Sequence, residues 1–140
     1  MKRIERDGLS FPVPEDWKFD DERAADGWTL TLQSAGTAFA VVRLDRNLPD
    51  PEEMIEAAME ALRAEYRDLE EEPALETIAG DMAHGTDLEF LSLDVPTTCW
   101  LRGFHGPAGT VLVMCQVSDL DRVENEPALR AITSGMRTEE

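Results

Sequence analysis

Two apolar runs decide the fold of this chain. They are Thr98-Cys-Trp-Leu-Arg-Gly-Phe-His105 and Thr110-Val-Leu-Val-Met-Cys-Gln-Val117. Gly106-Pro-Ala-Gly109 joins them and carries the residue types of a reverse turn, so the whole stretch predicts a β-hairpin. The second run is mainly apolar at positions that point to either side, which predicts a strand buried on both faces. We therefore expect this hairpin to lie centrally in a sheet.

The length of the hairpin turn decides how Cys99 and Cys115 are placed. A turn of three residues would set the two cysteines face to face across the strand pair, whereas a turn of four would send them to opposite faces. The sequence leaves both registers open. In either register, cysteines flanked by apolar residues predict buried, reduced thiols without a disulfide.

The composition predicts one globular domain over residues 1–140. Hydrophobic residues make up 42% of the chain and are spread over its length, which argues against disorder. The formal net charge of -17 would repel phosphate backbones and anionic lipid, so nucleic acid and membrane surfaces are disfavoured as partners. No apolar run is long enough to span a membrane, and the charged N-terminus lacks a secretory signal, which predicts a cytoplasmic protein.

Alternating apolar residues predict three strands before the first helix, over residues 9–14, 27–33 and 37–44. The middle one has the clearest period of two, because Trp28, Leu30 and Leu32 fall on one face. The prolines of the first suit an edge strand. The charged stretch 18–26 is expected to be a solvated loop.

Two amphipathic helices are expected, each with a single apolar stripe. The first begins at Asp50-Pro51, an N-cap followed by a proline that suits the first turn, and ends before Pro73. Its stripe consists of Ile55, Met59, Leu62, Tyr66 and Leu69. The second begins near residue 125, carries Leu129, Ile132 and Met136, and stops near Gly135.

Further strands are predicted over residues 75–78 and 82–93, between the first helix and the hairpin. Strands joined by short turns favour antiparallel pairing, and both helical stripes must be buried against the resulting sheet. The predicted class is α+β, with an antiparallel β-sheet of six to seven strands packed with two α-helices.

The sequence contains no recognised catalytic or phosphate-binding motif. His84 and His105 lie beside predicted turns and are interpreted as exposed turn residues. The two cysteines lie too far along their strands from His105 for a zinc site, and the acidic segment 119–126 lacks the spacing of a calcium loop. We therefore predict no catalytic residue, no metal and no cofactor.

Trp100, Arg102 and Phe104 alternate on one face of the hairpin and allow two interpretations. An arginine between two aromatic rings is typical of a cation–π stack on a protein-binding surface. Alternatively, Trp100 and Phe104 are core residues beneath a helix, while Arg102 extends towards the edge. The second interpretation is favoured, because apolar strand residues are usually core.

The ordered set of motifs in this chain resembles the PsbP-like fold. The fold is shared with the Ran-binding Mog protein and with the small bacterial Eag-type adaptors of type VI secretion, to which the length and layout are most similar. The motifs that carry the resemblance are Phe11-Pro-Val-Pro-Glu-Asp-Trp17, the strand over residues 37–43, Tyr66-Arg-Asp-Leu69, Ile78-Ala-Gly80 and Asn125-Glu-Pro-Ala-Leu129.

The resemblance implies a non-enzymatic protein-binding domain. Eag-type adaptors use an apolar sheet surface, generally as dimers, to shield hydrophobic helices of a partner protein. In this chain such a sheet face would involve Phe39, Val41, Phe90, Trp100 and Arg102. The alternative is a small-molecule-binding domain or an uncharacterised enzyme, which would require a pocket with converging polar groups near His84 or His105.

Overall fold

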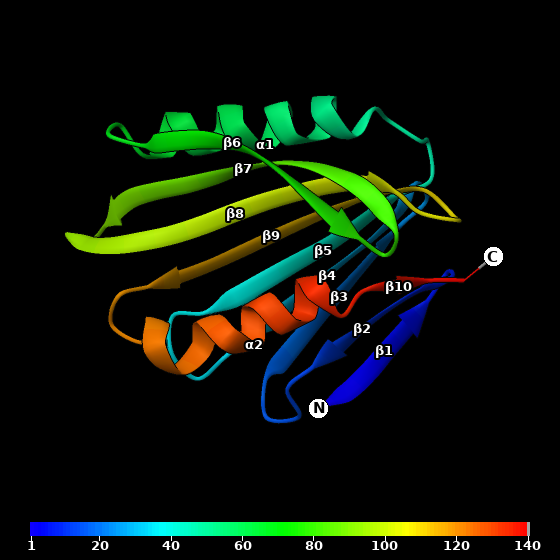
Figure 1. Ribbon diagram of the computed structural model, residues 1–140, viewed down its shortest axis with the longest axis horizontal. Coiled ribbons are helices and arrows are strands. Elements are labelled where there is room, and N and C mark those ends of the chain that lie inside the picture. Colours follow the sequence, from blue (N-terminus) through cyan, green and yellow to red (C-terminus); the bar gives the residue numbers. More distant parts are fainter. Residues whose placement is uncertain (140) are drawn as a thin grey trace.

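The computed structural model describes residues 1–139, which form ten strands and two helices (Figure 1). In chain order these are β1 Lys2–Arg6, β2 Leu9–Val13, β3 Lys18–Ala24, β4 Gly27–Gln33, β5 Phe39–Asp45, α1 Pro51–Glu65, β6 Glu70–Ile78, β7 Asp81–Ser92, β8 Val95–His105, β9 Thr110–Ser118, α2 Arg122–Ser134 and β10 Arg137–Thr138.

The strands of residues 1–139 form two antiparallel sheets. The larger has seven strands in the order β3-β4-β5-β9-β8-β7-β6, and the smaller has the order β1-β2-β10. The α+β class and the antiparallel sheet of seven strands are therefore confirmed. The predicted hairpin is β8 and β9, and it occupies interior positions of the larger sheet.

The hairpin turn contains four residues, because His105 pairs with Thr110. The backbone N–H of Gly106 donates to the carbonyl of Gly109 at 2.8 Å and closes the turn. In this register Cys115 lies opposite Trp100, so Cys99 and Cys115 point to opposite faces.

The two faces of the larger sheet are covered by different elements (Figure 1). Helix α1 packs on one face over β7, β8 and β9, where Met59 and Leu62 meet Leu88 and Leu101. Helix α2 and the smaller sheet cover the opposite face. The hydrophobic core is thus two layers of side chains that share the β8–β9 hairpin as their common wall.

Helix α1 starts where the sequence predicts and ends earlier. The Asp50 side chain accepts a hydrogen bond from the Glu52 N–H at 2.9 Å, and Pro51 is the first helical residue. The helix stops at Glu65, and the ring of Tyr66 stacks on Phe90 with 4.0 Å between centroids. The expectation that the helix continues to Leu69 is wrong, because the chain turns there to pair with β7.

The charged stretch 18–26, expected to be a solvated loop, contains strand β3, and the charged N-terminus forms strand β1. Every residue of β3 is exposed, so this edge strand has no buried face and shows no hydrophobic alternation. Its pairing with β4 from Lys18 to Ala24 stabilises it instead. Likewise β1 pairs with β2, and the Arg6 guanidinium donates to the Asp21 carboxylate at 2.8 Å. Charged side chains on edge strands oppose pairing with other chains.

Asp121 connects the start of α2 to the start of β5. Its carboxylate accepts hydrogen bonds from the Thr37 N–H at 3.0 Å, from the Thr37 hydroxyl and from Asn125 Nδ2 at 2.6 Å. Burial raises the pKa of Asp121, but these hydrogen bonds outweigh it and leave the pKa below its usual range. Helix α2 begins at Arg122, three residues before the predicted start, in register with this contact.

We expect Asp121→Asn to lower the free energy of unfolding by about 1 kcal/mol at neutral pH. Because the pKa of Asp121 is lowered in the folded protein, its stabilisation is present above the ordinary carboxyl range and is lost as the pH falls through the folded-state pKa. Chemical denaturation between about pH 7 and pH 2 would show that the free energy of unfolding falls less with decreasing pH in Asp121→Asn than in the wild-type protein. Asp16→Asn, at an exposed turn, is the control, and an identical change in both variants would contradict the assignment.

Candidate functional site

The five residues predicted to form one binding face lie on two faces of the sheet. Phe39, Val41 and Phe90 are on the side of α1, whereas Trp100 and Arg102 are on the side of α2. Side chains alternate along a strand, and the β7–β8 register pairs Phe90 with an odd-numbered residue of β8. The expected grouping of all five on a single face is therefore corrected.

Three of these five residues are buried by the protein itself. Phe90 lies under α1 in contact with Tyr66. Trp100 has no exposed surface and Arg102 is 4% exposed. The interpretation of Trp100 and Phe104 as core residues is confirmed, and the guanidinium of Arg102 extends towards the edge strand β6 without reaching solvent.

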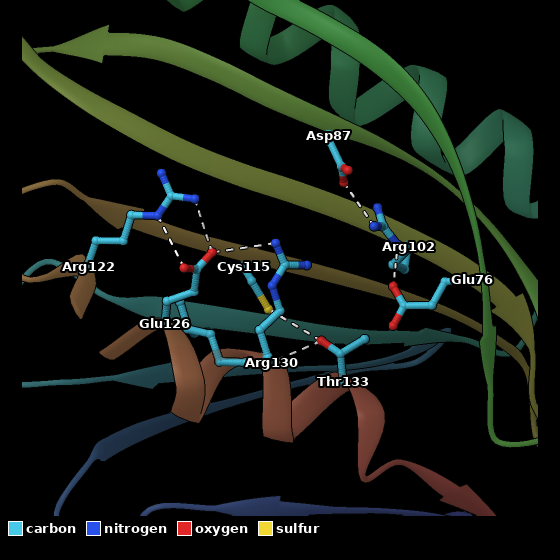
Figure 2. Close-up of polar contacts among 9 residues, drawn as sticks. Glu76, Asp87, Arg102, Cys115, Arg122, Glu126, Arg130 and Thr133 are labelled. Carbon is cyan, nitrogen blue, oxygen red and sulfur yellow. Dashed lines mark hydrogen bonds and ion pairs between the residues drawn. The ribbon is translucent and has the colours of Figure 1, made fainter. Parts of the chain in front are cut away.

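Arg102 connects three neighbouring strands on the side of α2 (Figure 2). Its Nε donates to Glu76 Oε1 on β6 at 2.8 Å, and its Nη1 donates to the Leu101 carbonyl at 2.9 Å. Its Nη2 lies 2.9 Å from Asp87 Oδ1 on β7, an ion-pair separation without the alignment of a hydrogen bond. These contacts compensate for the burial of a guanidinium in the sheet.

Gly85 makes the space that Arg102 occupies. It lies opposite Arg102 in the β7–β8 pair, and a Cβ at this position would lie 2.7 Å from Arg102 Cδ and 2.2 Å from the Leu101 carbonyl oxygen. Any larger residue would displace the arginine or separate the two strands. Gly85 is a structural requirement that the sequence alone did not indicate.

One area on the side of α1 extends beyond that helix and is called the open face. It is formed by side chains of β4, β5 and β9 that the strand register sets side by side. Its apolar centre is half-buried, and its polar rim continues on β4 and at both ends. The open face comprises Thr29, Thr31, Gln33, Phe39, Val41, Arg43, Leu112, Met114 and Gln116.

The opposite face has a cavity of about 480 Å³ between the β6–β7–β8 part of the sheet and α2, which we call the charged groove. Carboxylates of β6 and β7 line one wall, and Arg122 and Arg130 line the other. Trp100 and Thr98 also line it. Sequence reasoning missed this site, because β6 and α2 are far apart in the chain.

Glu126 connects the two arginines of the charged groove (Figure 2). Its carboxylate accepts from Arg122 at 3.2 and 3.3 Å and lies 3.5 Å from Arg130 Nη2. The hydrogen bonds from Arg122 lower the pKa of Glu126, so the carboxylate stays ionised. The Arg130 guanidinium lies 3.8 Å from the centroid of the Trp100 ring, a cation–π contact.

The remaining candidates for chemistry are dispersed. His84 Nδ1 lies 3.3 Å from Glu52 Oε1 at the surface on the α1 side, and His105 is exposed beside the hairpin turn. Cys99 and Cys115 are free and buried. Within residues 1–139, no group of three or more His, Cys, Asp or Glu side chains is arranged to hold a metal ion. In the same range no helix is long and apolar enough to span a bilayer.

We expect Arg102→Ala to lower the free energy of unfolding by about 2–4 kcal/mol, because removing one partner of a buried pair leaves the other polar groups uncompensated. The partial exposure of Glu76 and Asp87 keeps the loss below that of a fully dry site. Arg43→Ala is the control, since Arg43 is half-exposed and lies 3.9 Å from its partner Asp45. Equal losses in urea denaturation of the two variants would contradict the structural role of Arg102.

We expect both thiols to be unreactive in the folded protein. Burial raises the pKa of Cys115 to about 12 and also raises the pKa of Cys99, so neither forms thiolate at neutral pH. Titration with a chromogenic disulfide reagent should detect no thiol in the native protein and two after denaturation. Rapid native labelling, with Cys99→Ala and Cys115→Ala identifying the reactive thiol, would contradict this prediction.

Comparison by sequence finds no relative for this chain. No protein-family model matches it, and no curated protein is similar to it. Its similarity to known proteins therefore lies in the three-dimensional structure.

Several solved structures share the fold over nearly the whole chain. CyanoP, the cyanobacterial PsbP of Synechocystis sp. PCC 6803, has a TM-score of 0.66 at 10% identity, over 99% of this chain and 92% of that one. LpqN of Mycobacterium tuberculosis, described as involved in cell envelope biogenesis, has a TM-score of 0.58 at 14% identity, over 94% and 83%. PA94 of Pseudomonas aeruginosa, a protein of unknown function described as a putative regulator, has a TM-score of 0.55 at 13% identity, over 100% and 98%.

The sequence identities are too low to transfer a function from these proteins. The structural similarity establishes the architecture alone. The structure of CyanoP matches this chain over 99% of its length, which includes both helices and the seven-stranded sheet. The chain has the PsbP-like fold.

Proposed function

We propose that this protein is a non-enzymatic adaptor or chaperone that binds another protein through the open face. The observation that carries the proposal is the partly exposed apolar centre of that face, at Phe39, Val41, Leu112 and Met114. These side chains are half-buried although they lie in the middle of a seven-stranded sheet, where residues of β8 are fully buried. Apolar side chains that a domain leaves uncovered at such a place are typical of contact surfaces.

The dimensions of the open face favour an apolar helix as the bound element. Neighbouring strands lie about 4.8 Å apart, so β4, β5 and β9 span about the 10 Å diameter of a helix. Leu112 and Met114 also pack against the cluster beneath α1, so α1 would lie beside the bound helix. A helix laid in a groove binds through anchors spaced three and four residues apart.

The resemblance to Eag-type adaptors supports a more specific form of the proposal. Those adaptors shield hydrophobic helices of type VI secretion effectors, generally as dimers, and this chain would do the same in the cytoplasm. Two open faces in a homodimer would enclose more apolar surface than one. The net charge of -17 keeps such a complex soluble and opposes binding to nucleic acid or anionic membranes.

Val41→Asp tests the open face. The probe is a 20-residue leucine–alanine helix fused to a soluble carrier and co-expressed with the full chain. We expect the wild-type protein to keep the fusion in the soluble fraction and to co-elute with it. We expect Val41→Asp to lose this activity, because the binding of an apolar helix would bury an unpaired carboxylate.

Val123→Asp is the matched control, since Val123 is 87% exposed on α2 and lies outside the open face. Thermal denaturation of both variants verifies that they fold, and sedimentation velocity measures the oligomeric state. If the wild-type protein leaves the fusion insoluble, or if the two variants lose binding equally, the proposal is wrong.

A further inference from the structure

We propose that the charged groove binds a free basic amino acid of the arginine type, with its cationic side chain on the carboxylates of β6 and β7 and its carboxylate on the side of Trp100 and α2. The groove lies on the opposite face of the sheet from the open face. The inference is therefore independent of the proposed adaptor function.

The carboxylate wall contains like charges placed directly across from each other. In the β6–β7 register, Glu70 lies opposite Glu89 and Glu72 lies opposite Asp87, all on the side of α2. Like charges at directly opposed positions of an antiparallel pair destabilise a sheet. Of these four, only Asp87 has an ion-pair partner within residues 1–139, which is Arg102. A bound cation would remove this repulsion.

The cationic group that fits this wall is larger than a metal ion. Within residues 1–139 the side chains do not converge into a metal-binding group, although five carboxylates line the groove, four of them on the side of α2. Carboxylates spread over two strands suit a planar guanidinium, whose five N–H donors can reach several acceptors. This argument selects an organic cation.

Trp100 indicates that the ligand also carries an oxygen acceptor. Its indole Nε1–H is fully buried and has no hydrogen-bond partner within residues 1–139, and the same side chain lines the groove. Buried donors without acceptors are rare, because each costs free energy. The Arg130 guanidinium covers the ring at 3.8 Å, and its side chain is 48% exposed.

A ligand carboxylate would complete this wall. It would draw Arg130 aside, accept from the indole N–H and pair with Arg130 and Arg122, whose only carboxylate partner within residues 1–139 is Glu126. A molecule that carries a guanidinium at one end and a carboxylate at the other satisfies both walls. The cavity of about 480 Å³ accommodates a molecule of this size.

Isothermal titration calorimetry of the full chain tests the proposal with L-arginine, L-citrulline and agmatine. We expect saturable binding of L-arginine. L-citrulline replaces the guanidinium by a neutral urea and agmatine lacks the carboxylate, so each should bind at least about tenfold more weakly, because charge-assisted hydrogen bonds are lost. Capped arginine, with both termini blocked, distinguishes a free amino acid from a basic side chain of a protein.

Two variants identify the walls of the groove. The double variant Glu72→Gln with Glu89→Gln should abolish L-arginine binding, whereas Glu60→Gln with Glu124→Gln, which removes the same charge at exposed sites elsewhere, should leave it unchanged. Trp100→Phe should reduce the difference in affinity between L-arginine and agmatine, because it removes the N–H that would donate to the ligand carboxylate. Thermal denaturation verifies that each variant folds.

Three results would overturn the proposal. The first is no binding of L-arginine by the wild-type protein at millimolar concentration, and the second is equal affinity for L-arginine and L-citrulline. The third is tighter binding of capped arginine than of free arginine, which would assign the groove to a protein side chain.

Discussion

The antiparallel pairing of β8 with β9 is the interaction on which the rest of the structure depends. Strand β8 is buried on both faces and β9 is buried on the side of α2 and half-buried on the side of α1, so one layer of backbone hydrogen bonds separates two hydrophobic clusters. Leu101 faces α1 while Trp100 faces α2; α1 packs on β7, β8 and β9, and α2 packs between β9 and β2 of the smaller sheet. A shift of the pair by one residue would exchange the two sets of side chains and disrupt both clusters.

Burial on two sides leaves the outer strands to form the functional surfaces. Helix α1 covers β7 and β8 and reaches only the near side of β9, so that the open face extends from β9 over β5 and β4. Helix α2 lies on the other face, and β6 and β7 extend past it with their carboxylates. One sheet therefore presents the partly apolar open face on one side and the charged groove on the other. The buried Arg102 keeps β6 and β7 aligned beside that groove.

Local signals predicted the elements with strong capping or alternation. Asp50 and Pro51 marked the start of α1, Trp28, Leu30 and Leu32 marked β4, and Gly135 marked the end of α2. The predictions were wrong where strand pairing overrides the local preference of the residues for a loop or a helix. Strand β3 has no buried side chain, and β6 contains Pro73, which an edge strand tolerates because one side of its backbone is unpaired. The segment 66–69 leaves the helical pattern because β6 must reach β7.

The sequence by itself determined the α+β class, the central hairpin and the core role of Trp100 and Phe104, because these follow from turn chemistry and from side-chain periods within short stretches. Only the tertiary structure decided which face each strand residue occupies and which distant residues meet. The four-residue turn separated Cys99 from Cys115, and the β6–β7 register brought Glu70 opposite Glu89. Both outcomes depend on strand pairing and on the packing of helices, which no local pattern of residues encodes.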